Sequence, residues 1–263
     1  MNNRTKPAYL LRPVEMALLF FIIALASRQL LFAYDPYKTA IQQLPDILRW
    51  LERPVRWTIF VGLGLWVVHR KPVSWMVREL GLTGNARQGL WLGFLACSPM
   101  LVMPMVLGRF TATETVLRIV FMSAIWPLGE EILFRGYVFG QLVKRGGMNL
   151  WAAAITTGFV FGILHLGQAA VQNLPLSGEI GTVAIVSIGG IFFAWLFATW
   201  DYNLWVPMGM HLFMNLWWSV FDMADSPLGG WLPNVLRLVT VVLAIVLTVY
   251  RDRWPVLRLN RQA

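Results

Sequence analysis

The sequence predicts an all-α fold, a polytopic transmembrane bundle of about eight helices. Of the 263 residues, 57% are hydrophobic and only 13% are charged. A water-soluble domain of this length could not bury so much apolar surface in one core. Apolar runs near or above about 18 residues recur along the chain, the length that a helix needs to cross about 30 Å of hydrocarbon. We therefore expect one integral membrane domain over residues 1–263.

The apolar runs predict where each span lies. The first follows a basic start, as a cleavable signal peptide would, but it is too long for the usual signal core, and we interpret it as a retained helix. The second is short, and the fourth is long enough to tilt strongly or to extend beyond the bilayer. Residues 35–56 mix apolar and charged side chains, which favours a connecting helix between the first two spans. The expected spans are 15–33, 55–69, 88–107, 115–143, 150–168, 180–200, 204–221 and 232–250.

The distribution of Lys and Arg predicts that both termini are cytoplasmic, since cytoplasmic loops carry the excess of these residues. An even number of spans agrees with that result. The net charge of +9 does not indicate nucleic acid, because the cations lie near the ends of apolar segments. We expect a lipid bilayer around the chain, in a bacterial cell membrane. One side receives Arg4, Lys6, Arg12, Arg70, Lys71, Arg78, Arg87, Lys144, Arg145, Arg251, Arg253, Arg258 and Arg261; the other receives Lys38, Arg49, Arg53, Arg56 and Arg109, with the acidic Glu179, Asp222 and Asp225 in its last two loops.

Two smaller features constrain the packing. Cys97 is the only cysteine and lies in an apolar run, so an internal disulfide and a Cys-ligated metal site are excluded and a buried apolar role is expected. Gly158 and Gly162 form a small-xxx-small pattern, which predicts that the fifth span approaches a neighbouring helix closely. That approach would bring His165 tight against another helix.

The fourth span carries charged residues that need a reason. A charge at the bilayer centre costs about 2.5 to 3.5 kcal/mol on insertion scales. Glu131 and Arg135 are four positions apart with the acid first, the favourable orientation for an ion pair on one helix face. Glu130 projects about 100° away around the helix, so it needs a partner from another element.

Few polar residues elsewhere could be that partner. The chain has three histidines, and His69 lies at a helix end beside two cations, so we assign it to the interface without a catalytic role. His165 lies on the fifth span, and His211 shares a helix face of the seventh span with Asn215. A lone His on an apolar helix is usually a packing residue. Two of them, with an unpaired Glu and an Asn beside one His, point instead to a functional site.

These three segments resemble the CAAX protease and bacteriocin-processing family, also called the Abi family of glutamate-type intramembrane peptidases. Its signature is Glu-Glu-x-x-x-Arg, then Phe-x-x-x-His, then His-x-x-x-Asn, each on a separate membrane helix. All three motifs are present without substitution at residues 130–135, 161–165 and 211–215. A family-like catalytic core is therefore expected over about residues 115–221, and nothing specific is recognised in the first 110 residues.

The resemblance implies an endopeptidase that hydrolyses a peptide bond in a membrane-embedded or lipid-anchored protein or peptide. Glu130 and His165 would activate a water molecule, and His211 and Asn215 would stabilise the oxyanion. The residue chemistry agrees, because a carboxylate in an apolar site accepts a proton from water more readily than a surface Glu does, and because His and Asn can donate to developing negative charge. Glu131 and Arg135 would hold the helix that presents Glu130.

Three alternatives stay open at this point. One Glu and two His could bind zinc, but no His-Glu-x-x-His element occurs and family members are regarded as working without metal, so no cofactor is expected. A non-catalytic immunity or regulatory protein of the same family would use the polar cluster only to hold helices together. A proton-coupled transporter is a third hypothesis, because Glu and His chains also relay protons, although no inverted repeat is apparent.

Overall fold

The computed structural model describes residues 13–108, 114–167, 172–224 and 227–257. Within these ranges the chain is helical and contains no β-strand, which confirms the predicted all-α class. Several residues that entered the charge count lie outside the described part, namely Arg4, Lys6, Arg12, Arg109, Asp225, Arg258 and Arg261.

Helices coincide with all eight predicted spans, with differences at their ends. The second span is longer than predicted, because its helix begins at Asp46 and continues through Pro54 to His69. The third span is two helices joined at Cys97, which is fully buried as expected. The helices are α1 (Pro13–Phe32), α2 (Asp35–Gln43), α3 (Asp46–His69), α4 (Val73–Glu79), α5 (Ala86–Ala96), α6 (Ser98–Val106), α7 (Val116–Val120), α8 (Trp126–Glu131), α9 (Gly140–Lys144), α10 (Leu150–Ile163), α12 (Leu176–Thr199), α13 (Trp205–Val220) and α14 (Trp231–Val249), with a short 3₁₀ turn, η3 (Arg251–Arg253).

The fourth span is one continuous helical run with two wider segments. Between α7 and α8 lies the π-helix η1 (Phe121–Ile125), and between α8 and α9 lies the π-helix η2 (Ile132–Phe139). Segments of π-helix occur preferentially at functional sites. Here they flank the Glu-Glu pair at the end of α8.

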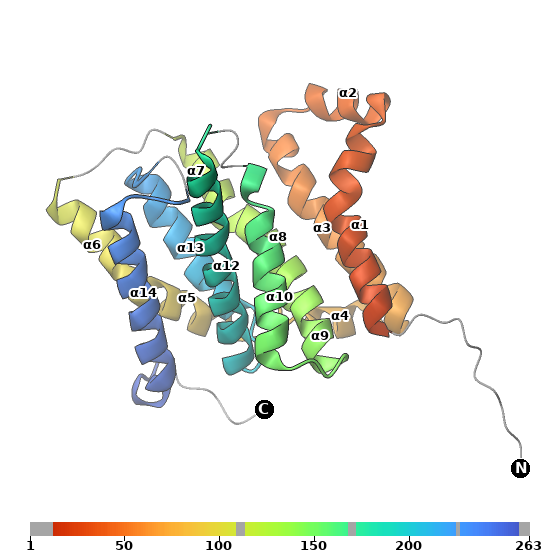
Figure 1. The fold of residues 1–263 in the computed structure, drawn as a ribbon. Coiled ribbons are helices and arrows are strands. Elements are labelled where there is room, and N and C mark those ends of the chain that lie inside the picture. Colours follow the sequence, from red (N-terminus) through yellow and green to blue (C-terminus); the bar gives the residue numbers. More distant parts are fainter. Residues whose placement is uncertain (1–12, 109–113, 168–171, 225–226, 258–263) are drawn as a thin grey trace, which may run out of the picture.

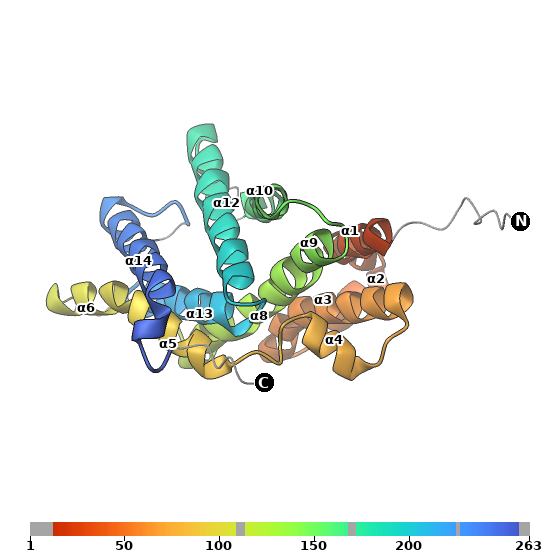
Figure 2. The ribbon, with the colours of Figure 1, turned by 90° about the horizontal axis from the view of Figure 1, so that it is seen from below.

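The helices form two groups around this central run (Figures 1 and 2). On one side α1 and α3 pack beside it, while α5, α6, α13 and α14 lie on the other. Two clusters of buried apolar side chains follow this division, one between α1, α3, η2, α10 and α12 and the other between α5, α12, α13 and α14. The central run therefore lies at the junction of the two groups.

Glycines allow α10 and α12 to lie unusually close. A Cβ atom on Gly158 would lie 2.7 Å from a side-chain carbon of Ile191, and one on Gly162 would lie 2.6 Å from the carbonyl oxygen of Val183. Only a residue without a side chain fits at such positions. The close approach predicted from the small-xxx-small pattern is confirmed, and α12 is the partner.

Large apolar side chains cover the outside of the bundle, among them Ile22, Ile59, Phe159 and Ile188, each more than half exposed. Such a surface is suited to lipid rather than water. Among the described helices, four are long and apolar enough to cross a membrane by length and composition: residues 14–32, 86–106, 176–199 and 231–249. The helices that carry the motif residues are not among these four, because they are shorter or interrupted by charge. In Figure 1, α1 begins and α14 ends at the same end of the bundle. The cytoplasmic placement of that end stays a prediction.

Candidate active site

The central helix presents three charged side chains to the interior of the bundle. Glu131 is fully buried, Arg135 is 2% exposed, and Glu130 is 8% exposed. Arg135 Nη1 lies 3.2 Å from Glu131 Oε1, so the predicted ion pair is present. Burying both charges is favourable only where each has partners. The groups that act as those partners belong to α3, α10, α12 and α13.

Aromatic rings enclose Arg135. Its guanidinium carbon lies 4.7 Å from the ring centre of Phe161 on α10 and 5.4 Å from that of Phe193 on α12, distances at which a cation is attracted to a ring face. Its Nη2 also donates to the carbonyl oxygen of Gly190 on α12. Arg135 thus ties the central helix to the α10 and α12 pair.

Glu130 finds its partners on two other helices. Its Oε1 accepts a hydrogen bond of 3.0 Å from Arg53 Nη2 on α3, and its Oε2 lies 3.9 Å from His211 Nε2 on α13. The contact with His211 agrees with the expectation from the sequence. The contact with Arg53 was not predicted, because Arg53 was considered only as one of the loop cations that indicate topology.

A close contact between α3 and α8 explains why Arg53 reaches Glu130. A Cβ atom on Gly129 would lie 2.8 Å from Cβ and 3.0 Å from Cα of Pro54, so the two backbones meet at these residues. Arg53 and Glu130 are their direct neighbours in the sequence. Pro54 has no backbone N–H to donate within α3. Its compact ring provides the surface for this contact.

His211 is oriented by Glu131. Its Nδ1 lies 2.8 Å from Glu131 Oε1, and its ring packs against Phe193 with 5.3 Å between ring centres. Because Glu131 is ion-paired with Arg135 and accepts this bond as a carboxylate, Nδ1 of His211 carries a proton. The remaining nitrogen, Nε2, is directed to Glu130.

His165 lies two residues past the C-terminal end of α10 and is half-buried. Its Nδ1 is 2.8 Å from the carbonyl oxygen of Phe161, and its ring lies against the ring of that residue. A carbonyl oxygen can only accept, so Nδ1 is the protonated nitrogen and Nε2 of the neutral ring keeps a lone pair. His165 is close enough to interact electrostatically with both Glu130 and His211.

Asn215 lies one turn after His211 on α13, as the shared helix face predicted. Its Nδ2 donates to the carbonyl oxygen of Met122 at 3.1 Å. Met122 belongs to the π-helix η1. The bond uses one of the two N–H groups of the amide and links α13 to the central run.

His69, the third histidine, belongs to a different part of the molecule. Its Nε2 is 2.9 Å from Gln141 Oε1 on α9, and its ring lies against Trp75 on α4. It makes no contact with Glu130 or the other two histidines within the described chain. The assignment of His69 away from the candidate site therefore agrees with the structure.

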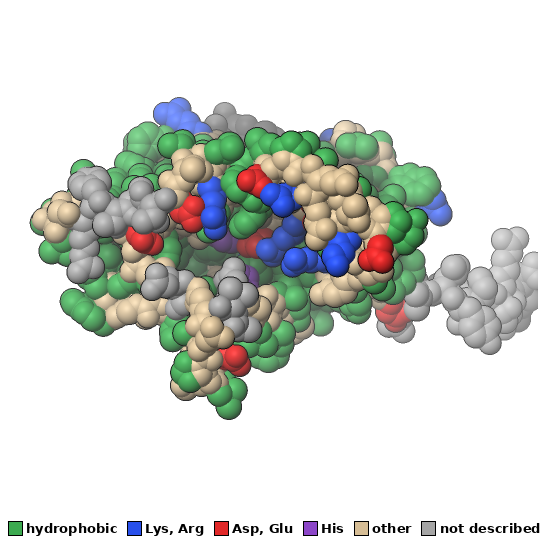
Figure 3. Space-filling view, turned by 90° about the horizontal axis from the view of Figure 1, so that it is seen from above, with side chains coloured by type: hydrophobic (Ala, Val, Ile, Leu, Met, Phe, Trp, Pro, Cys, Tyr) green, Lys and Arg blue, Asp and Glu red, His purple; other side chains and the backbone are tan. Residues whose placement is uncertain are grey.

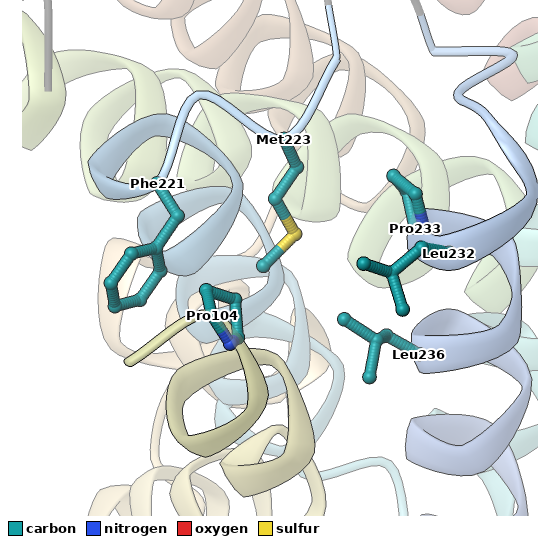
Figure 4. Close-up of a pocket in the computed structure, with 6 residues that line it drawn as sticks. All are labelled: Pro104, Phe221, Met223, Leu232, Pro233 and Leu236. Atoms are coloured by element: carbon teal, nitrogen blue, oxygen red, sulfur yellow. The ribbon is translucent and has the colours of Figure 1, made fainter. Parts of the chain in front are cut away.

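The candidate site opens to the upper face of the bundle. Figure 3 shows a hollow in which His side chains are visible, bordered by Lys and Arg and by acidic side chains. An apolar groove of about 240 Å³ also lies between α3 and the central run, lined by Leu51, Pro54, Val55, Thr58, Ile59, Ile125, Leu128, Gly129 and Ile132. Another pocket, between α6, the end of α13 and α14, measures about 20 Å³ and is lined by apolar side chains (Figure 4). That space is about the size of one water molecule, so it offers no ligand site.

The donor set bears on the zinc alternative. In the described part of the chain no three His, Cys, Asp or Glu side chains gather in an arrangement that could hold a metal ion. The Nδ1 atoms of His165 and His211 are already engaged, and Oε1 of Glu130 is bonded to Arg53. These three atoms make hydrogen bonds in the structure described, and the absence of a metal from the reaction stays a prediction.

Comparisons with known proteins cover this part of the chain. Residues 112–217 match the family model described as type II CAAX prenyl endopeptidase Rce1-like. YdiL of Bacillus subtilis (strain 168), a proposed membrane peptidase by its name, is 30% identical over 99 residues. That match covers 38% of this chain and 34% of the relative, so the chain spans about a third of the relative's length. No solved structure matches.

The matched segment contains every residue of the three sequence motifs but not Arg53, which lies on α3 and is separated from it by three further helices, α4, α5 and α6. Together with the apolar helices, the match makes the chain an integral membrane protein. Over residues 112–217 the chain is therefore similar to the Rce1-like family of type II CAAX prenyl endopeptidases, which agrees with the resemblance carried by its three motifs.

Proposed function

We propose that this protein is a glutamate-type intramembrane endopeptidase. It hydrolyses a peptide bond in a membrane-embedded or lipid-anchored protein or peptide. The observation that carries the proposal is the meeting of Glu130 with His211, at 3.9 Å, inside an apolar bundle, with His165 within electrostatic range of both. These side chains come from three segments that are far apart in the sequence. Because burying ionisable groups in a membrane bundle costs free energy, their meeting indicates a functional site.

In this mechanism Glu130 and His165 activate the attacking water. The lone pair on His165 Nε2 is free to accept a hydrogen bond, because Nδ1 donates to the carbonyl of Phe161. Glu130 supplies a carboxylate oxygen that can take the proton of the water as it attacks. The water then adds to the scissile carbonyl carbon, and its proton passes by way of Glu130 to the leaving amine.

His211 and Asn215 stabilise the negative charge that develops on the carbonyl oxygen. The bond from His211 Nδ1 to Glu131 fixes the ring, so that Nε2 is the nitrogen available to the substrate once it carries a proton. The bond from Asn215 to Met122 uses one N–H of its amide, and the second N–H makes no hydrogen bond within the described residues. Loss of one such donor typically lowers the rate by about 10² to 10³.

Glu131 and Arg135 support the reacting groups without touching the substrate. Both are buried, and Glu131 connects the ion pair to the ring of His211. We propose that the reaction uses no metal. Hydrolysis that is lost on treatment with a chelator and restored by zinc would replace this mechanism with a metal-dependent one.

The test compares the membrane proteomes of cells that carry the intact protein or Glu130→Gln. An uncut precursor that accumulates only with the variant would identify both the activity and the substrate. His165→Ala and His211→Ala should produce the same precursor. His69→Ala is the matched control, because it removes the third imidazole, which contacts Gln141 and Trp75 rather than Glu130, and should leave cleavage intact.

The opposite result has a defined meaning. If Glu130→Gln processes every protein as the intact chain does, although it accumulates normally in the membrane, the hydrolytic mechanism is wrong. A cellular phenotype that Glu130→Gln fully complements would then favour a non-catalytic immunity or regulatory role for the same helix cluster.

A further inference from the structure

Arg53 is a charged residue at the candidate site that none of the three sequence motifs contains. It donates to Glu130 Oε1 at 3.0 Å across 77 positions of sequence. The two side chains differ in accessibility, since 40% of the Arg53 side chain is exposed but only 10% of that of Glu130. The guanidinium is thus the accessible member of the pair.

This ion pair conflicts with the role proposed for Glu130. A carboxylate oxygen that accepts a bond from a guanidinium has that lone pair committed and cannot take a proton from water through it. The second oxygen, Oε2, lies 3.9 Å from His211 Nε2, which is beyond hydrogen-bond distance, so the constraint falls on Oε1. Oε1 is therefore engaged by Arg53 in the structure described, and the pair with Arg53 has to open before the lone pair that accepts this bond can act.

Arg53 is well placed to exchange one carboxylate for another. Its guanidinium lies over the ring of Trp57, 4.3 Å from the ring centre, which fixes its plane without using an N–H. Among the described residues Glu130 is the only hydrogen-bond acceptor of Arg53. A guanidinium has five N–H groups in a planar fork that fits a carboxylate with two parallel bonds, so most of its donors remain open on the exposed side.

We propose that Arg53 binds a carboxylate of the peptide substrate, and that this exchange releases Oε1 of Glu130. The inference rests on the proposed function and adds a requirement on the substrate: a carboxylate close to the scissile bond. Two sources supply that group, the C-terminus of the peptide and an acidic side chain. In the absence of substrate, Arg53 holds Glu130 in a resting ion pair.

The test is a binding measurement that does not depend on hydrolysis. The full-length protein in zwitterionic nanodiscs is titrated against three short fluorescent peptides of Ala, Gly and Leu, followed by anisotropy. One peptide has a free C-terminal carboxylate, one has a C-terminal amide, and one has a C-terminal amide with an internal Asp. Nanodiscs without protein correct for binding to lipid.

We expect the intact protein to prefer a carboxylate peptide over the plain amide by about tenfold or more, the usual strength of a hydrogen bond to a charged group. Arg53→Gln should abolish the preference, and Arg53→Lys should keep part of it. Glu130→Gln should increase it, because the competing carboxylate is gone. The matched control is Arg49→Gln, one turn earlier on α3, which pairs with Asp46 and should change nothing.

The gain expected in Glu130→Gln separates this role from a structural one, since damage to the fold would lower binding in every variant. Whichever of the two carboxylate peptides binds more tightly identifies the source of the group. Equal binding of all three peptides to the intact protein, or an unchanged preference in Arg53→Gln, overturns the proposal. Failure of the proposed function would instead appear as the absence of an uncut precursor in cells, with the binding preference still present.

Discussion

Replacement of Arg135 by Met tests whether the buried ion pair holds the candidate site together. The substitution keeps an unbranched side chain of similar length but removes the charge. It leaves Glu131, which is fully buried, with His211 Nδ1 as its remaining partner. It also removes the cation from between the rings of Phe161 and Phe193.

The expected loss follows from this burial. Removing one partner of a buried pair costs about 3 to 5 kcal/mol, because the other charge remains in an apolar environment. That corresponds to about two to four orders of magnitude in the unfolding equilibrium constant. Replacing both partners, as in Glu131→Gln with Arg135→Met, should cost less than the sum of the two single changes, since no charge is then stranded.

Unfolding in mixed detergent micelles with increasing dodecyl sulfate measures both effects, with tryptophan fluorescence as the signal. Arg49→Met is the control, because Arg49 and Asp46 form an exposed pair on α3, with side chains 44% and 64% exposed. Exposed pairs contribute about 0 to 1 kcal/mol. A loss for Arg135→Met no larger than that of the control, or additive effects in the double variant, would refute the reasoning.

Three further predictions follow from single contacts. Gly129→Ala places a Cβ atom 2.8 Å from Pro54 and should destabilise the fold by about 1 to 3 kcal/mol, whereas Gly62→Ala on α3, with open space around it, should not; equal unfolding midpoints for the two would contradict the α3–α8 contact. Partial burial and the hydrogen bond to Glu52 raise the pKa of Tyr37 to about 12, so the stability that this phenol contributes is complete below about pH 10 and is lost as the pH rises through about 12. Tyr37→Phe should remove this pH dependence in unfolding titrations, and an unchanged profile would show that the phenol is not held as described. Precursor cleavage in isolated membranes should survive a strong zinc chelator, and its loss would reinstate the zinc alternative.

The architecture was predictable because a membrane imposes a simple rule on the sequence. Each span must be an apolar helix of sufficient length, so hydropathy alone located helices at all eight expected positions. The ends were less predictable. The helix α3 begins at Asp46, in a charged stretch that was interpreted as a connecting segment. This stretch can belong to the bundle because one of its cations, Arg56, is buried against Ser27 and the Ala24 carbonyl of α1. Partners from another helix compensate for charges that hydropathy counts as unfavourable.

The candidate site was predictable only where its contacts are local in sequence. The spacing of Glu131 and Arg135 predicted their ion pair, and that of His211 and Asn215 predicted a shared face. The bond between His211 and Glu131 joins two residues that are 80 positions apart, on different helices. No periodicity within either helix could have indicated which of the two glutamates His211 would contact.

The sequence by itself determined that this chain is a bundle of membrane helices carrying one acid, two imidazoles and a carboxamide of a known family pattern. The reason is that apolar length and motif spacing are properties of single helices. Only the tertiary structure decided that Arg53 forms an ion pair with Glu130, because that pair depends on a contact between Gly129 and Pro54 on different helices. A contact between two backbones depends on how the helices cross, and neither sequence segment specifies the crossing alone.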